Sequence, residues 1–377
     1  MVLEPLSTTL FDPYGVFAAP GRAPRVGVRR GGQVLDLAAA CAQHAPEWVG
    51  LFDQPSLDSF LAAGPEVWAQ VHAGVAEMDA PLLDLDGVEL LLPFTVADYV
   101  DFYSSEVHAR DVSKILRPER PTLPPAWHQL PIGYHGRAGT VVVSGTEIAR
   151  PRGILGLDAD GRAVVGPSER LDLEAELGFV VGTPSSGPVG LADAAEHVFG
   201  VVVVNDWSAR DVQAFETVPL GPMLGKAFAT SVSAWVTPLA ALDAARVSPP
   251  ARVHPVAEHL DDAGRRDGLD VTLRVHLNGE LLAEPPAAGL YWTWAQQLAH
   301  LSGGARMRTG DLLASGTVSG DGAPGSLLEL SWGGSRAVAG TGQHYLRDGD
   351  EVVITAIAPA AGGGRVELGE VRGRITA

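Results

Sequence analysis

The chain has 377 residues, of which 46% are hydrophobic, so it is long enough to bury a core in one large or two smaller domains. Its formal net charge of −18 disfavours a nucleic-acid backbone or an anionic membrane as a partner. No stretch approaches the ~20 apolar residues of a membrane span, and the single cysteine, Cys41, excludes a disulfide framework within the chain.

The first 93 residues are expected to form a small module of short strands and helices. Residues 25–37 contain two strand-like runs joined across Gly31 and Gly32, which predicts a hairpin. Helical patterns follow in residues 36–45, 56–64 and 65–78. We expect Cys41 to fill the core. The N-terminus lacks a basic start and an apolar run, so no signal peptide is expected, and with one cysteine we expect a cytoplasmic protein.

Strand signals dominate the remainder, so we place a boundary between a module of residues 1–93 and a domain of residues 94–377. Helices are expected at 104–117 and 290–302, whereas the polar, proline-rich residues 247–268 are expected to form a long surface excursion. Strands are expected within residues 139–151, 176–182, 197–208, 230–239, 269–284, 311–320, 327–332 and 350–358.

A Glu-x-Glu pair lies inside the stretch LDLEAELGFVVG, residues 171–182. Read as a strand, this stretch places Glu174 and Glu176 on one face and leucine and phenylalanine side chains on the other. Like charges on one strand face repel each other, so the pair needs an explanation. A solvated strand face would account for the pair taken alone, and so would a shared cation.

Three further acids, Asp101, Asp206 and Glu329, interrupt apolar or glycine-rich stretches. Asp206 ends an apolar strand and is expected at the mouth of that strand. Buried carboxylates repel one another unless a cation neutralises them, and Ca²⁺ and Mg²⁺ prefer oxygen ligands. Zinc is not expected, because nearby histidines and cysteines lack the spacing of zinc ligands.

Three long blocks, residues 98–146, 205–239 and 310–320, resemble the fumarylacetoacetate hydrolase family. The motifs DFYSS, GYHGR and NDWSARD carry this resemblance, which extends more loosely over the N-terminal module. The resemblance implies a mixed β-rich fold, with a small SH3-like module followed by a mixed β-sandwich roll, and a homodimer. It also implies hydrolysis of the small diketo acid 4-fumarylacetoacetate to fumarate and acetoacetate, the last step of tyrosine and phenylalanine breakdown.

The same resemblance implies Ca²⁺ or Mg²⁺ held by four carboxylates, which here are Asp101, Glu174, Glu176 and Asp206. A second Mg²⁺ position would involve Asp206, Lys226 and Thr230, although a lysine ammonium is a poor ligand. Asp172 precedes the motif, and we expect it to enter the strand or to be exposed rather than to bind the ion.

The resemblance assigns the general base to His108 and its orienting acid to Glu329, a base-plus-orienter pair of the kind that hydrolases use. Arg210, Gln213 and Lys226 match donors around the developing alkoxide. Positions that match contacts to the substrate are Tyr103, Arg117, Tyr134, Gln213, Thr217 and Thr317.

Two positions depart from the family pattern. Thr217 replaces a tyrosine that helps to bind a substrate carboxylate, and Ala229 replaces a glycine beside the lysine loop. Acylpyruvate hydrolases, decarboxylases and isomerases of the same superfamily therefore stay as alternatives, although the N-terminal module and the helix carrying His108 favour fumarylacetoacetate. A metal-binding scaffold without catalysis is a third interpretation, against which the presence of His108, Glu329 and Lys226 argues.

Overall fold

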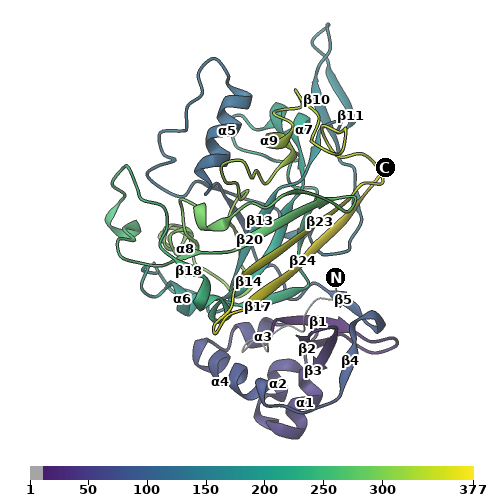
Figure 1. Cartoon of the computed structure of the whole chain (residues 1–377), viewed down its shortest axis with the longest axis vertical. Coiled ribbons are helices and arrows are strands. Elements are labelled where there is room, and N and C mark those ends of the chain that lie inside the picture. The colour runs from purple at the N-terminus through teal and green to yellow at the C-terminus, as the bar shows by residue number, and fades with distance from the viewer. Residues whose placement is uncertain (1–11) are drawn as a thin grey trace.

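A computed structural model describes residues 12–377 and shows a mixed, β-rich molecule (Figure 1). The main sheet has the strand order β4-β3-β2-β1-β17-β14-β13-β22-β6-β7, with β5, β8 and β16 pairing beside that path. A second sheet has the order β21-β20-β23-β24-β9. The predicted mixed β-rich fold class is therefore confirmed, whereas the SH3-like form of the N-terminal module stays a prediction.

The N-terminal part contains the predicted hairpin and helices. Its elements are β1 Tyr14–Ala18, β2 Arg25–Arg30, β3 Gln33–Asp36, α1 Leu37–His44, α2 Val49–Phe52, α3 Asp58–Leu61, α4 Pro65–Ala76, β4 Leu82–Asp84 and β5 Glu89–Leu91. Asp36 caps α1 by accepting a hydrogen bond from the amide of Ala39 at 3.0 Å. Strand β1 pairs with β17, so the main sheet continues from this part into the rest of the chain. The boundary at residue 93 stays a prediction.

The rest of the chain forms the larger part of the molecule, which is built around two packed sheets (Figure 1). Its strands are β6 Tyr99–Phe102, β7 Gly133–His135, β8 Val141–Val143, β9 Ile148–Ala149, β10 Arg152–Leu157, β11 Ala163–Pro167, β12 Leu171–Asp172, β13 Ala175–Val181, β14 Val198–Asp206, β15 Ser208–Ala209, β16 Thr230–Val232, β17 Trp235–Pro238, β18 Arg246–Val247, β19 Gly268–Leu269, β20 Thr272–Leu277, β21 Glu280–Ala283, β22 Leu312–Ala314, β23 Glu351–Pro359 and β24 Arg365–Thr376. Its helices are α5 Glu106–Leu116, α6 Ala194–His197, α7 Arg210–Glu216, α8 Trp294–Ser302 and α9 Leu327–Leu330.

Strand β14 is apolar until its end because both of its faces are covered. Val201 and Val203 belong to the core beneath the second sheet, whereas Val202 and Val204 belong to the core shared with the N-terminal helices. A strand buried on both faces needs a continuous apolar run. The apolar run ends at the buried, charged residue Asp206, which lies at the edge of the carboxylate cluster.

Residues 327–332 were predicted as a strand, and this prediction is wrong, because residues 327–330 form the short helix α9. Ser326 caps the helix by accepting a hydrogen bond from the amide of Glu329. The pattern Ser-x-x-Glu is typical of a helix start, and here it outweighs the apolar flanks of Glu329.

Residues 247–268 run largely over the surface, as expected, but a few contacts anchor them to the body of the protein. The guanidinium of Arg252 bonds to both oxygens of Asp262, at 3.1 and 2.8 Å, and lies over the rings of Tyr291 and Trp292. Leu260 is fully buried. Specific contacts made by Arg252 and Leu260 thus anchor the segment, which hydropathy along the chain does not reveal.

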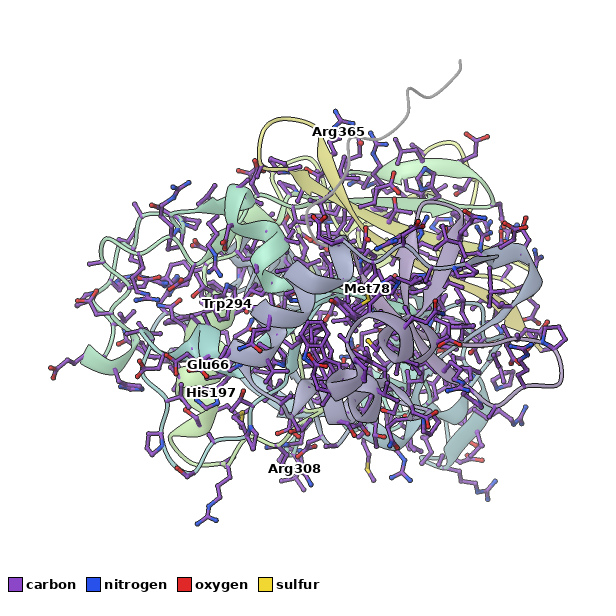
Figure 2. All side chains as sticks on the ribbon, turned by 90° about the horizontal axis from the view of Figure 1, so that it is seen from below. Glu66, Met78, His197, Trp294, Arg308 and Arg365 are labelled. Atoms are coloured by element: carbon purple, nitrogen blue, oxygen red, sulfur yellow. The ribbon has the colours of Figure 1, made fainter. Side chains whose placement is uncertain are left out.

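Figure 2 looks onto the N-terminal helices from below, with Met78 among them. Met78 is buried, and so is Cys41, which confirms the prediction that this cysteine fills the core. Burial raises the pKa of Cys41 to about 11. Within residues 12–377, no helix is long and apolar enough to cross a membrane.

The buried histidine of α4 predicts an acid-sensitive N-terminal core. Nδ1 of His72 shares a hydrogen bond with the hydroxyl of Tyr14, at 2.8 Å. Burial lowers the pKa of His72 to about 4. The unfolded chain takes up this proton near pH ~6.5, so the folded state should lose stability as the pH falls from ~6.5 to ~4. The loss should be on the order of 3 kcal/mol.

Urea unfolding of the parent and of the His72→Gln variant at pH 7 and pH 4 measures this loss, because the variant lacks the titrating ring. The difference between the unfolding free energies of the two proteins should change by about 3 kcal/mol between pH 7 and pH 4. An equal difference at both pH values would contradict the prediction.

Candidate active site

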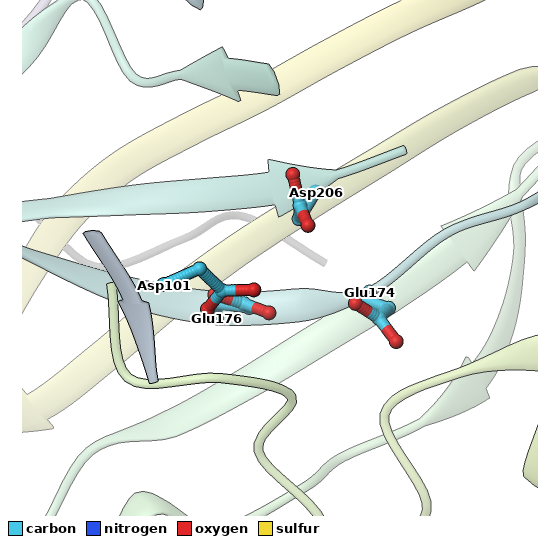
Figure 3. Close-up of side chains that lie close together, drawn as sticks. All are labelled: Asp101, Glu174, Glu176 and Asp206. Carbon is cyan, nitrogen blue, oxygen red and sulfur yellow. The ribbon is translucent and has the colours of Figure 1, made fainter. Parts of the chain in front are cut away.

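Four carboxylates meet at one end of the main sheet, three from β6, β13 and β14 and one from the residue just before β13 (Figure 3). Each of the four, Asp101, Glu174, Glu176 and Asp206, offers an oxygen, and these oxygens all lie within 4.8 Å of one another. All four residues are buried, and Glu176 and Asp206 are 0% exposed. The structure thus brings together the residues that the sequence predicts as ion ligands.

Strand register explains why these side chains converge. The amide of Asp206 donates to the carbonyl of Glu174 at 3.2 Å, so the end of β14 lies beside the start of β13. Asp101 is paired with Ala314 of β22, which in turn pairs with Gly178 of β13. Because alternate residues share a sheet face, Glu176 and Asp101 point to the same side as their neighbours Gly178 and Ala314.

Strand β22 lies between β6 and β13, and a sharp turn at Gly316 follows it. Gly316 has a φ of +74°, and a Cβ atom at this position would lie 2.0 Å from the carbonyl oxygen of Phe102. Only glycine fits this conformation and this close approach. The turn carries the next residues, Thr317 and Val318, past the cluster, where the amide of Val318 donates to the carbonyl of Ala175 at 2.9 Å.

Two of the four carboxylates carry oxygens that no donor in the described part of the chain reaches. Within residues 12–377, neither oxygen of Glu176 nor Oδ1 of Asp101 has a hydrogen-bond partner. Burial, together with the neighbouring carboxylates, raises the pKa of both groups well above the usual range. Buried oxygens without donors, in an oxygen-only cluster, fit a hard divalent cation.

Glu174 and Asp206 are balanced by cations of the chain. Burial would raise the pKa of Glu174, but Arg210 and Lys226 lower it overall, so Glu174 is charged. Arg210 Nη2 donates to Glu174 at 2.6 Å, and Lys226 Nζ donates to Glu174 and, at 2.8 Å, to Asp206. Asp206 also accepts hydrogen bonds from the hydroxyls of Tyr134 at 3.0 Å and Thr230 at 2.7 Å.

These contacts bear on the predicted second ion position. The oxygens of Asp206 already accept bonds from Lys226 and Thr230, the two other residues assigned to that position. Burial would lower the pKa of Lys226, but Asp206 and Glu174 raise it overall, so the amine is protonated and has no lone pair for a metal. The second position stays a prediction.

His108 and Glu329 form a buried pair beside the cluster. Nδ1 of His108 lies 2.8 Å from Oε2 of Glu329, and Nε2 lies 4.0 Å from Oε1 of Glu174. His108 sits in the first turn of α5, which Ser105 caps. Oε2 of Glu329 also accepts from the hydroxyls of Ser319 and Ser326, at 3.0 and 2.7 Å. The pair leaves Nε2 directed toward the carboxylates.

Asp172 lies in the short strand β12, just before β13, as one of the two expectations has it, and it is not among the four clustered carboxylates. The alternative expectation, that it is exposed, is wrong. Asp172 is 0% exposed and accepts a hydrogen bond from Nε of Arg210 at 2.8 Å. Arg210 opens α7, and its Nη1 bonds Gln213 at 3.1 Å, so the predicted donors share one helix face. The alternation of side chains along a strand predicts which face Asp172 occupies. It does not predict that Arg210, from another element, covers that side chain.

The predicted substrate contacts lie at different depths. Tyr103 packs against the ring of His108, with ring centroids 5.5 Å apart, and Thr317 is buried. Arg117 ends α5 and is exposed. Thr217 donates its hydroxyl to the carbonyl of Gln213 at 2.6 Å, so this hydroxyl is engaged by its own helix. The roles of all these residues stay predictions.

Sequence reasoning missed two residues that bond Glu329, namely Ser319 and Ser326. The helix-start pattern from Ser326 to Glu329 is a signal that could have identified one of them. Ser319 is ten residues from Glu329 and reaches it only through the fold.

Two family models match most of the chain. Residues 13–84 match the model described as Fumarylacetoacetase N-terminal, and residues 99–376 match the model described as Fumarylacetoacetate (FAA) hydrolase C-terminal. Both the hairpin module and the whole carboxylate cluster therefore fall within matched segments.

Named relatives match over nearly the full length. Fumarylacetoacetase of Rattus norvegicus is 40% identical over 96% of this chain and 94% of its own length. Fumarylacetoacetase of Homo sapiens is 39% identical with the same coverage, and that of Oryza sativa is 38% identical over 93% of this chain and 90% of its own length.

Solved structures share the fold at lower identity. A fumarylacetoacetate hydrolase from Exiguobacterium antarcticum aligns with a TM-score of 0.61 and 20% identity, covering 97% of this chain and 99% of that one. A maleylpyruvate hydrolase from Sphingobium sp. SYK-6 aligns with a TM-score of 0.56 and 16% identity, covering 97% and 99%.

Proposed function

The chain belongs to the fumarylacetoacetate hydrolase family, and from this we propose that it hydrolyses 4-fumarylacetoacetate to fumarate and acetoacetate. The observation that carries the proposal is the buried pair of His108 and Glu329, which lies beside a cluster of four carboxylates. Named relatives at about 40% identity support this substrate over others of the superfamily.

His108 is the proposed general base. Glu329 accepts the hydrogen bond of Nδ1–H, so Nε2 is the nitrogen free to take a proton. The water oxygen forms a bond to the fumaryl carbonyl carbon while its proton passes to Nε2. The C–C bond then breaks, its electron pair forms the enolate of acetoacetate, and His108 returns the proton to the departing carbon.

The carboxylate cluster is proposed to hold a divalent ion, Ca²⁺ or Mg²⁺, through Asp101, Glu174, Glu176 and Asp206. Oδ1 of Asp101 and both oxygens of Glu176, which have no hydrogen-bond partner within residues 12–377, support this assignment. When bound, such an ion polarises carbonyl oxygens and stabilises the negative charge of an enolate.

Arg210, Gln213 and Lys226 are proposed to stabilise the alkoxide that forms when water adds to the carbonyl. Arg210 and Lys226 are buried cations, and a donor placed in this way typically contributes ~10²–10³ to the rate. Tyr103, Arg117, Tyr134 and Thr317 are proposed to hold the ends of the substrate. Thr217 contributes little in this scheme, because its hydroxyl is bonded to Gln213.

We also propose a cytoplasmic homodimer acting in tyrosine and phenylalanine breakdown. The free cysteine supports a reducing compartment. The loop after α7 exposes Val218, Leu220 and Met223 by 82%, 96% and 66%, and exposed apolar side chains on one loop support a protein partner. Sedimentation at several concentrations tests the dimer.

The deciding experiment follows the ultraviolet absorbance of 4-fumarylacetoacetate and the release of fumarate. The parent chain with added Mg²⁺ or Ca²⁺ should consume the substrate and release one fumarate for each molecule consumed. Hydrolysis of acylpyruvates without hydrolysis of fumarylacetoacetate would overturn the proposed substrate. No turnover of either compound would favour a metal-binding scaffold.

A further inference from the structure

Asp172 is a fully buried carboxylate that the proposed chemistry does not use. Oδ1 accepts from the amide of Leu327 at 2.7 Å, and Oδ2 accepts from the amide of Leu328 at 3.0 Å and from Nε of Arg210 at 2.8 Å. Its side chain is 0% exposed. A buried carboxylate with donors on both oxygens is held in one orientation.

The partners of Asp172 lead to the two halves of the site. Leu327 and Leu328 open α9, the helix that carries Glu329, and Glu329 bonds Nδ1 of His108. On the other side, Arg210 donates through Nη2 to Glu174. His108 and Glu174 then face each other at 4.0 Å. The contacts close a ring in which Asp172 is the member remote from the carboxylate cluster and from Nε2 of His108.

We propose that Asp172 is a positioning residue that fixes the general base relative to the carboxylate cluster. The inference rests on the proposed hydrolysis. Helix α9 has 4 residues, too few to be stable alone, and its first amides need an acceptor. Asp172 supplies that acceptor and so sets the place of Glu329. A misplacement of about 1 Å in such a pair costs ~10² in rate.

The charge of Asp172 has a second consequence for the cluster. Arg210 lies between two carboxylates, Asp172 and Glu174, and bonds both. Asp172 thereby balances the guanidinium and leaves the charge of Glu174 available to a cation. Without Asp172, the positive charge of Arg210 would act on Glu174 alone and weaken the binding of a divalent ion.

The variant Asp172→Asn separates positioning from plain structural support. Both oxygens of Asp172 accept hydrogen bonds from N–H groups. Whichever way the asparagine amide is turned, its NH₂ therefore faces one of these donors. We expect kcat for fumarylacetoacetate to fall ~10²-fold with KM within about threefold of the parent value. Calorimetric titration with Mg²⁺ should show a Kd raised about tenfold.

The variant Asp172→Glu keeps the charge and moves the carboxylate by one methylene. It should lower kcat about tenfold but retain the Mg²⁺ affinity of the parent. Asp311→Asn is the matched control, because Asp311 is buried, accepts from the amide of Arg308 at 2.8 Å and lies at the far end of β22. The control should lower the unfolding temperature and leave kcat and Kd unchanged.

The inference is overturned if Asp172→Asn lowers the unfolding temperature while kcat and the Mg²⁺ Kd stay within twofold of the parent. It is also overturned if neither Asp172 variant folds, because the carboxylate is then needed for folding itself. If the parent hydrolysed no fumarylacetoacetate, the proposed function would fail, and the Mg²⁺ affinities would still decide whether Asp172 balances Arg210.

Discussion

Replacement of His108 by alanine is expected to lower kcat for fumarylacetoacetate by about 10²–10⁴-fold, the usual contribution of a general base. The physical reason is that Nε2 is the ring nitrogen left free, because Nδ1 is bonded to Glu329 at 2.8 Å. His108 lies outside the group of carboxylates that could hold an ion. The affinity for Mg²⁺ should therefore stay within a few-fold of the parent value.

Steady-state rates and calorimetric Mg²⁺ titrations of the same preparation check both parts of this expectation. His44→Ala is the matched control, because His44 is exposed and bonds only the carbonyl of Asp79 among the partners seen in residues 12–377. The control should have the parent rate. A His108→Ala enzyme that turns over at the parent rate would remove His108 from the proposed mechanism.

Replacement of Glu174 by glutamine is expected to abolish both ion binding and turnover. Glu174 is charged, contributes an oxygen to the cluster and is the counter-ion of Arg210 and Lys226. The neutral amide removes one of the negative charges that balance Arg210 and Lys226, which then keep only Asp172 and Asp206 as partners. The site becomes more positive and repels a divalent cation. We expect Mg²⁺ affinity to fall by at least about 100-fold, more than changes around a metal's outer partners produce.

Glu66→Gln is the control for this variant, since Glu66 is an exposed glutamate on α4 (Figure 2). Its metal content and rate should equal those of the parent. Metal analysis after dialysis against Mg²⁺ measures ion content directly. An unchanged content in Glu174→Gln would show that the ion, if one binds, lies elsewhere.

The members of the cluster carry local signals, but the set of four ligands was predictable only from the resemblance to known sequences. Glu174 and Glu176 are two residues apart, which places them on the same face of a strand. Asp206 is a charged residue at the end of an otherwise apolar strand. Asp101 carried a weaker signal, and the resemblance to known sequences was needed to group it with the others. The mixed, β-rich class followed from the abundance of strand signals.

What the sequence could not provide were contacts between distant segments. The sequence left open whether Asp172 enters the strand or is exposed, because its partner Arg210 is 38 residues away and meets it only through the pairing of β12 with β15. Glu329 was placed in a strand, since its leucine flanks outweighed the helix-start signal of Ser326. Arg252 anchors its segment through rings of residues about 40 positions later, which no local pattern encodes.

The most direct test of the central claim is the anomalous scattering of crystals of the parent chain soaked in Mn²⁺, a hard divalent cation that binds similar oxygen ligands. The account predicts one strong peak within about 2.6 Å of an oxygen from each of Asp101, Glu174, Glu176 and Asp206. It is contradicted if no peak lies among these four residues and the oxygens of Asp101 and Glu176 bond instead to water or to protein donors.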